Sequence, residues 1–142
     1  HKVDGLVARG LAEVVGTEQD GNRPPRTTYR LTDAGRELLV AWISSAITVV
    51  ENPYFSFSLA LGELEALGPE RAARLLTERV TVLDEHIAQM RDSLEQGRNQ
   101  GAKRIWMLAH EHRLATLTTE RDYIASVVHD IESKELTWPT SH

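Results

Sequence analysis

The chain has 142 residues, of which 41% are hydrophobic and 26% charged, and its net charge at pH 7 is −5. This composition is typical of a globular protein and argues against intrinsic disorder. The chain has no cysteine, which excludes disulfides and cysteine-based zinc sites and fits a cytoplasmic protein. The longest uncharged stretch, residues 38–50, is too short and too polar to cross a bilayer, so we expect no membrane partner.

The first third of the chain predicts the end of a helix followed by a β-hairpin. Residues 1–9 carry apolar side chains at helical spacing, and Gly10 is a suitable residue to end that helix. The helix begins without a cap residue, so we expect its first part to lie upstream. Residues 11–15 and 27–31 are short, apolar or β-branched segments, which predict two strands. The region between them is rich in Gly, Asp and Pro and predicts a long turn.

Four further helices are predicted after the hairpin. Thr32 is a good N-cap for the first of them. Asn52 and Pro53 are expected to stop that helix and cap the second, and residues 68–70 to end the second and start the third. Apolar spacing and breaker residues place these helices at residues 33–50, 54–67, 69–96 and 102–136. The segment 54–67 is the most apolar and is expected to be buried.

The last two of these helices carry long apolar stripes. In the third the spacing is that of a heptad seam, and in the fourth the stripe is interrupted by Arg121. On this pattern each helix is too long and one-sided to bury its stripe within one module. We therefore expect a homodimer interface formed by Leu76, Leu83, Ile87, Met90, Leu114, Leu117, Ile124, Val128 and Ile131.

Two segments of the N-terminal third resemble a known family. Residues 6–11 read Leu-Val-Ala-Arg-Gly-Leu, which is similar to the end of the recognition helix and the first wing strand of PadR-type transcriptional regulators. Residues 23–35 read Arg-Pro-Pro-Arg-Thr-Thr-Tyr-Arg-Leu-Thr-Asp-Ala-Gly, which resembles the wing and the next helix start of that family. MarR-like winged helices share the Leu-Thr-x-x-Gly element, but Pro-Pro-Arg with Tyr-Arg-Leu favours PadR. The remainder is similar to the dimerising domain of the larger PadR subfamily in length and hydrophobic layout only.

The resemblance implies a mainly α fold with one β-hairpin. Residues 1–52 would form a partial winged helix-turn-helix domain, and residues 53–142 a helical dimerisation and regulatory domain. The implied function is that of a DNA-binding transcriptional regulator, a dimeric repressor released by a ligand or partner. Its partners would be a pseudo-palindromic operator in double-stranded DNA and a second copy of the chain. The residues that read bases would lie upstream.

Basic residues gather around the predicted wing. Arg23, Arg26, Arg30 and Arg36 fall within fourteen residues that contain one acid, Asp33. Arginine at a hairpin tip can reach phosphates or a narrow minor groove, and the alternative is a solvated loop. We expect Arg30 to pair with a nearby acid or phosphate rather than to read a base. The candidate DNA contacts are Lys2, Arg23, Arg26, Thr27 and Arg30.

No enzyme signature is present in the sequence. His110 and His112 are two positions apart and do not share a helix face, so we expect no metal site. The chain has no glycine-rich phosphate loop and no nucleophile elbow, and we expect neither catalysis nor a cofactor. Trp42 and Trp106 could line a pocket for a small aromatic effector, and core packing is the alternative. His86 and His129 are isolated in the sequence and are expected at the surface or at an interface.

A second function fits the same sequence. The chain could be a helical protein-interaction adaptor with a degenerate winged helix that does not bind DNA. The acidic net charge favours this alternative. Thr27 and Thr28 favour it too, because they stand where the PadR family usually has a basic residue and a tyrosine.

Overall fold

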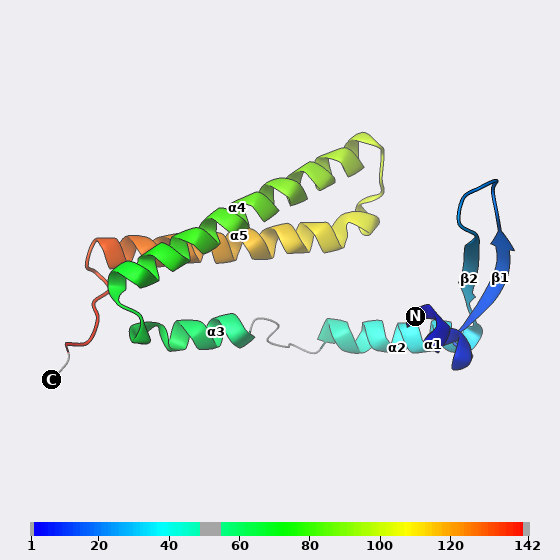
Figure 1. Ribbon diagram of the computed structural model, residues 1–142, viewed down its shortest axis with the longest axis horizontal. Coiled ribbons are helices and arrows are strands. Elements are labelled where there is room, and N and C mark those ends of the chain that lie inside the picture. Colours follow the sequence, from blue (N-terminus) through cyan, green and yellow to red (C-terminus); the bar gives the residue numbers. More distant parts are fainter. Residues whose placement is uncertain (1, 49–54, 141–142) are drawn as a thin grey trace. The chain divides into compact units, whose positions relative to one another are not determined.

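The computed structural model of the chain describes residues 2–48 and 55–140 (Figure 1). These belong to two compact units, over residues 1–53 and 54–142. The expected helix end at Val50 and helix start at Tyr54 lie outside the described residues. No helix within the described ranges is long and apolar enough to cross a bilayer. The architecture is mainly helical with one antiparallel hairpin, which confirms the predicted fold class.

The first unit contains a short helix, a two-stranded hairpin and a longer helix. Its elements are α1 (Lys2–Ala8), β1 (Ala12–Glu18), β2 (Arg26–Leu31) and α2 (Asp33–Thr48). The strands pair from Ala12 opposite Leu31 to Glu18 opposite Arg26, with an irregularity between Val14 and Gly16. The first strand is longer than predicted, because Gly16 is accommodated within the ladder at this irregularity rather than starting the turn.

The end of α1 is fixed by the glycine that the sequence pointed to. Gly10 has a φ of 71°, in the left-handed region that glycine adopts without strain. Its N–H donates to Val7 O at 3.0 Å, and the N–H of Leu11 donates to Leu6 O at 2.9 Å. These two bonds make up a Schellman motif, which ends the helix at Ala8 so that the strand can begin at Ala12.

A set of backbone contacts around Leu11 then joins α1, the hairpin and α2. The N–H of Thr32 donates to Leu11 O at 3.1 Å, and the Thr32 hydroxyl donates to Gly10 O at 2.6 Å. The same hydroxyl oxygen accepts the N–H of Gly35 at 3.1 Å, which confirms Thr32 as the N-cap of α2. A Cβ atom on Gly35 would lie 1.9 Å from Leu11 O, so no side chain fits there. We call these four residues the Leu11 junction.

The second unit is built on two long antiparallel helices. Its elements are α3 (Phe55–Gly62), a 3-10 turn η1 (Leu64–Ala66), α4 (Pro69–Asn99) and α5 (Arg104–Glu132). The two long helices lie side by side and form most of the unit (Figure 1). After α5 the chain returns to the start of α4, where Trp138 Nε1 donates to Leu67 O at 2.6 Å and Glu65 O at 3.2 Å.

Two predictions for this unit are wrong in detail. Residues 54–67 do not form one buried helix: α3 ends at Gly62, and Leu59 is 55% exposed. Hydrophobicity alone therefore overstated the burial of this segment. Gly97 lies inside α4 rather than in the following loop, and a Cβ there would lie 3.1 Å from Met107 Sδ. The glycine lets α5 approach closely, and Gly101, with a φ of 73°, makes the turn instead.

The apolar stripes of α4 and α5 face each other within one chain. Ile124 is 1% exposed, and the buried core also contains Leu76, Leu83, Ile87, Leu117 and Ile131. These six residues were predicted to contact a second copy. The premise of that prediction, that neither helix can bury its stripe within one module, is wrong because each helix buries the stripe of the other.

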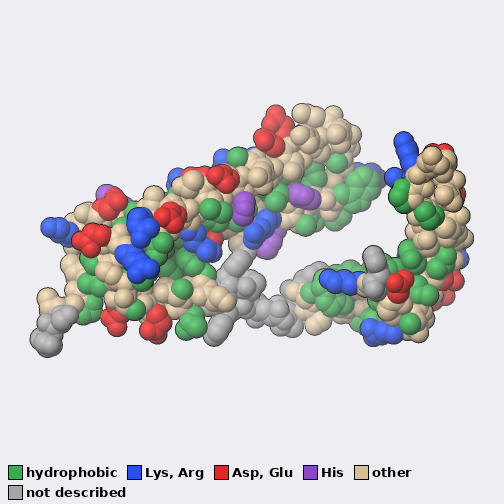
Figure 2. All heavy atoms as spheres, in the orientation of Figure 1, with side chains coloured by type: hydrophobic (Ala, Val, Ile, Leu, Met, Phe, Trp, Pro, Cys, Tyr) green, Lys and Arg blue, Asp and Glu red, His purple; other side chains and the backbone are tan. Residues whose placement is uncertain are grey.

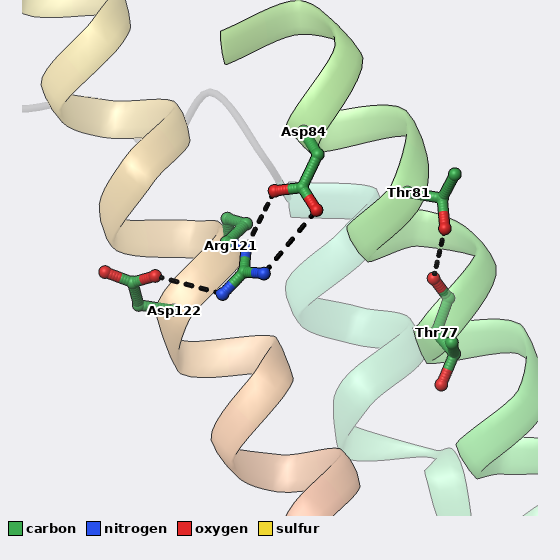
Figure 3. Close-up of polar contacts among 5 residues, drawn as sticks. All are labelled: Thr77, Thr81, Asp84, Arg121 and Asp122. Carbon is green, nitrogen blue, oxygen red and sulfur yellow. Dashed lines mark hydrogen bonds and ion pairs between the residues drawn. The ribbon is translucent and has the colours of Figure 1, made fainter. Parts of the chain in front are cut away.

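Arg121, which interrupts the stripe of α5, is held at the surface of this contact. Its Nε donates to Asp84 Oδ1 at 2.7 Å across the two helices, and its Nη1 lies 3.4 Å from Asp122 Oδ1 (Figure 3). The hydrogen bonds and charge of Asp84 raise the pKa of the Arg121 guanidinium above its ordinary value. On the neighbouring turn of α4 the hydroxyl of Thr81 donates to Thr77 O, as Figure 3 also shows. The arginine therefore contributes to the register of the two helices while the apolar residues around it are buried.

Candidate nucleic-acid interface

The tip of the β-hairpin is a tight turn followed by two prolines. The N–H of Arg23 donates to Asp20 O at 3.2 Å, and Gly21 adopts a φ of 59° within this turn. Pro24 and Pro25 then lead into β2 and restrict the backbone on that side. The hairpin therefore presents a stiff, fully exposed tip.

Two arginines flank these prolines. Arg23 and Arg26 are exposed, and within the part of the chain that the structure describes neither forms an ion pair. Arg26 stands opposite Glu18 in the strand register. Their guanidinium groups can therefore approach an external anion without first breaking an internal salt bridge.

Arg30 differs from these two arginines, because it is already paired. Its Nε and Nη2 both donate to Glu13 Oε1, at 2.8 Å and 2.6 Å. The two residues stand opposite each other in the strand register. This confirms the expectation that Arg30 pairs with a nearby acid, and it makes Arg30 the weakest of the arginine candidates for a DNA contact.

The other two predicted DNA contacts lie on exposed parts of the first unit. Thr27 faces Thr17 across the strands, with 3.4 Å between the two hydroxyl oxygens. Lys2 is exposed on the first turn of α1. The structure thus brings Arg23, Arg26 and Thr27 together at the outer half of the hairpin, whereas Lys2 belongs to the helix before it.

The first unit also has an apolar pocket at the base of the hairpin. Its volume is 340 Å³. Its walls come from α1, from α2 and from the base of the hairpin, where the chain enters the first strand and leaves the second. The lining residues are Leu6, Leu11, Leu31, Gly35, Leu38, Leu39 and Trp42. Trp42 is 66% exposed. Trp106 belongs to the second unit, where it is 70% exposed and its ring centroid lies 5.6 Å from Lys103 Nζ. Of the two predicted effector residues, Trp42 therefore lines this pocket.

Sequence reasoning missed two residues that shape this interface. Glu13 was not singled out, because its pairing with Arg30 depends on the strand register. Gly35 was noted only as part of a family motif, and its close approach to Leu11 O gives the physical reason for a glycine at that position. The sequence did offer one signal for this role, since Gly35 lies three residues after Thr32, the predicted N-cap of that helix.

The chain has the fold of PadR-like transcriptional regulators. It matches Bacillus subtilis PadR, solved in complex with operator DNA, with a TM-score of 0.76 and 18% identity over 92% of this chain and 74% of that one. It matches the PadR-like transcriptional regulator BC1756 of Bacillus cereus with a TM-score of 0.67 and 16% identity, over 93% and 74% of the two chains. The smu.1604c protein of Streptococcus mutans UA159 gives a TM-score of 0.66 and 17% identity, over 89% and 74%. No protein-family model and no curated protein matches the sequence.

Proposed function

We propose that this chain is a DNA-binding transcriptional regulator of the PadR type, acting as a dimeric repressor released by a ligand or partner. The observation that carries the proposal is the likeness of its fold to a PadR solved in complex with operator DNA. The exposed arginines at the hairpin tip, which form no ion pair among the described residues, support it independently. The two PadR-type neighbours from Bacillus are regulators rather than enzymes, which supports a role without catalysis.

In this proposal the hairpin is a wing that contacts the DNA backbone or the minor groove. Arg23 and Arg26 supply the charge, and the stiff Pro24-Pro25 segment between them lowers the entropy cost of binding. Lys2 adds a phosphate contact from α1, and Thr27 adds a hydroxyl donor. These contacts position the protein and carry no base preference.

The second unit is proposed to form the dimer. Its seam is already occupied within one chain, so a second copy would contact the outer surface of the helical hairpin. Leu75 and Val82, 37% and 48% exposed, are seven residues apart and share one face of α4. Of the predicted interface residues, Met90, Leu114 and Val128 are the ones that remain partly exposed. A two-fold dimer would present two wings to a pseudo-palindrome.

An effector, in this proposal, is a small aromatic compound bound at the pocket beside Trp42. The pocket walls are almost all leucine side chains, which suits an apolar ring. Its walls include α1 and the base of the hairpin, so occupation of the pocket would bias the position of the wing.

The DNA proposal is tested by the double variant Arg23→Ala/Arg26→Ala. We expect it to bind duplexes of every sequence more weakly. The slope of log K against log salt should fall by about one unit for each phosphate that the variant no longer neutralises. Fluorescence anisotropy with a labelled duplex at two or more salt concentrations measures both quantities.

The matched control is Arg71→Ala/Arg91→Ala, which removes the same charge from exposed positions of α4. It should keep the salt slope of the unaltered chain. If both double variants bind more weakly by the same factor, the effect reflects net charge and the wing assignment fails. If the wing variant binds DNA as the unaltered chain does, the adaptor function becomes the better interpretation.

A further inference from the structure

A polar pocket of 310 Å³ lies on the surface of the second unit, between α4 and α5. Its floor is apolar: Leu117 is 4% exposed and Met90 is half-buried. Its volume is at the lower end of the range of about 300–1,000 Å³ that small-molecule sites occupy. The pocket is formed by the paired helices of one unit.

Helical spacing explains why polar side chains line this pocket. His86 and Ser93 are seven residues apart on α4, and His110 and Arg113 are three apart on α5. Residues at these spacings share a helix face. Because the helices are antiparallel, two histidines 24 residues apart in the sequence line the same hollow.

The walls of the pocket are cationic or neutral. His86, His110 and Arg113 are exposed at its walls, Gln89 and Ser93 supply neutral polar groups, and no carboxylate belongs to its described lining. Figure 2 shows histidine side chains gathered beside those of Lys or Arg over the middle of the helical hairpin. In a chain with a net charge of −5, this is a local concentration of basic groups.

Two acidic side chains near the pocket in sequence are engaged by other arginines. Glu111, next to His110, accepts from Arg104 Nη2 at 3.1 Å. Asp84, two residues before His86, accepts from Arg121 Nε at 2.7 Å. These two carboxylates therefore do not compete for the histidines that line the pocket.

We propose that this pocket binds a small organic oxyanion, a carboxylate or phosphate that carries a short apolar part. His86 and His110 bind the oxyanion through charge-assisted hydrogen bonds, and Arg113 adds positive charge to the wall. Met90 and Leu117 receive the apolar part.

The test is a titration of the imidazole NMR signals of the full chain, which has six histidines. The probes are inorganic phosphate and butyrate, and sodium chloride at equal ionic strength is the reference. We expect the signals of His86 and His110 to shift with saturation while that of His129, outside the pocket, does not. Saturation by phosphate assigns a phosphate head group, and saturation by butyrate assigns a carboxylate.

The variant His86→Gln/His110→Gln should bind the saturating probe about a hundredfold more weakly or worse, because it removes two charge-assisted hydrogen bonds and each is worth about tenfold or more in affinity. His129→Gln should bind it as the unaltered chain does. Both pocket histidines are exposed, so the core is left intact.

Two results would overturn the proposal: saturation by neither probe, or equal shifts of all histidine signals. No DNA is present in the titration, so its result is independent of the proposed regulator function.

Discussion

The helical unit, residues 54–142, and the tip of the hairpin use arginine in different ways. In the helical unit Arg79, Arg104 and Arg121 each pair with a carboxylate, and Arg79 also lies 3.6 Å from the ring centroid of Phe57. At the tip of the hairpin Arg23 and Arg26 form no ion pair within the described residues. Arginine therefore stabilises packing at these three positions of the helical unit and remains available to an external anion at the tip of the hairpin.

The two units also differ in where their stability comes from. The helical unit has a continuous core, in which Ile124 is 1% exposed. Among the described residues of the first unit Ala12 and Gly35 are buried, while Leu38 and Leu39 of α2 remain 48% and 41% exposed. The helical unit depends on apolar burial, whereas the hairpin depends on the hydrogen bonds of the Leu11 junction.

The substitution Ile124→Ala should have the largest effect, because it removes a side chain from the core that the helical unit forms within one chain. Deleting a fully buried aliphatic side chain costs about 2–5 kcal/mol of unfolding free energy. Urea denaturation followed by circular dichroism measures this decrease. Ile105→Ala, at a side chain that is 67% exposed, is the control and should change the free energy by less than about 0.5 kcal/mol. Equal decreases in both variants would contradict the buried seam.

The substitution Gly35→Ala should act on the first unit alone. The added Cβ would lie 1.9 Å from a backbone oxygen that cannot rotate away, so α2 must move off the hairpin. We expect the unit to be less stable by about 1–3 kcal/mol, seen as faster amide hydrogen exchange at Thr32, whose N–H bonds to Leu11 O.

Gly16→Ala is the matched control for this change. A Cβ at Gly16 has no atom within 4 Å, so exchange at Thr32 should stay slow. Unchanged exchange in the Gly35 variant would show that the Leu11 junction does not hold the unit together.

The smallest expected effect concerns pH and sharpens the contrast in arginine use. The hydrogen bond from Arg104 lowers the pKa of the Glu111 carboxyl below its ordinary value. A lowered pKa means that folding favours the ionised carboxylate. The pair therefore stabilises the fold at pH values above the ordinary pKa of Glu111, and this stabilisation is lost as the pH falls through the pKa of the folded protein. Arg104→Gln should raise the Glu111 midpoint in a carboxyl NMR titration. Arg91→Gln should leave it in place, and a shift of equal size in both variants would assign the effect to net charge.

Local features of the first unit could be predicted because they depend on neighbours in the sequence. The end of α1 at Gly10 and the N-cap at Thr32 follow from residue type and position. The pairing of Arg30 with Glu13 could not be predicted, because it depends on the register of the two strands. The long turn does not determine that register, and the irregularity near Val15 shifts it.

The harder questions were about packing partners. The stripe through Leu76 and Ile124 was identified, but periodicity indicates only that a face is buried, and a second helix of the same chain satisfied it. His86 was interpreted as an isolated surface or interface residue, because His110, which lines the same pocket, lies 24 positions away in the sequence. Such pairs become visible only when the relative register of α4 and α5 is known.

The Leu11 junction has a mechanical consequence for the hairpin. The base of the strands and the start of α2 are in close contact, through the bond from Thr32 to Leu11 O and the close approach of Gly35. The hairpin is therefore fixed to that helix and moves with it as a lever arm. Strands of this length extend about 20 Å, so a turn of roughly 10° about Leu11 would carry the tip through about 3 Å. A modest reorientation of α2 would therefore be converted at Arg23 and Arg26 into a displacement comparable to the length of a hydrogen bond.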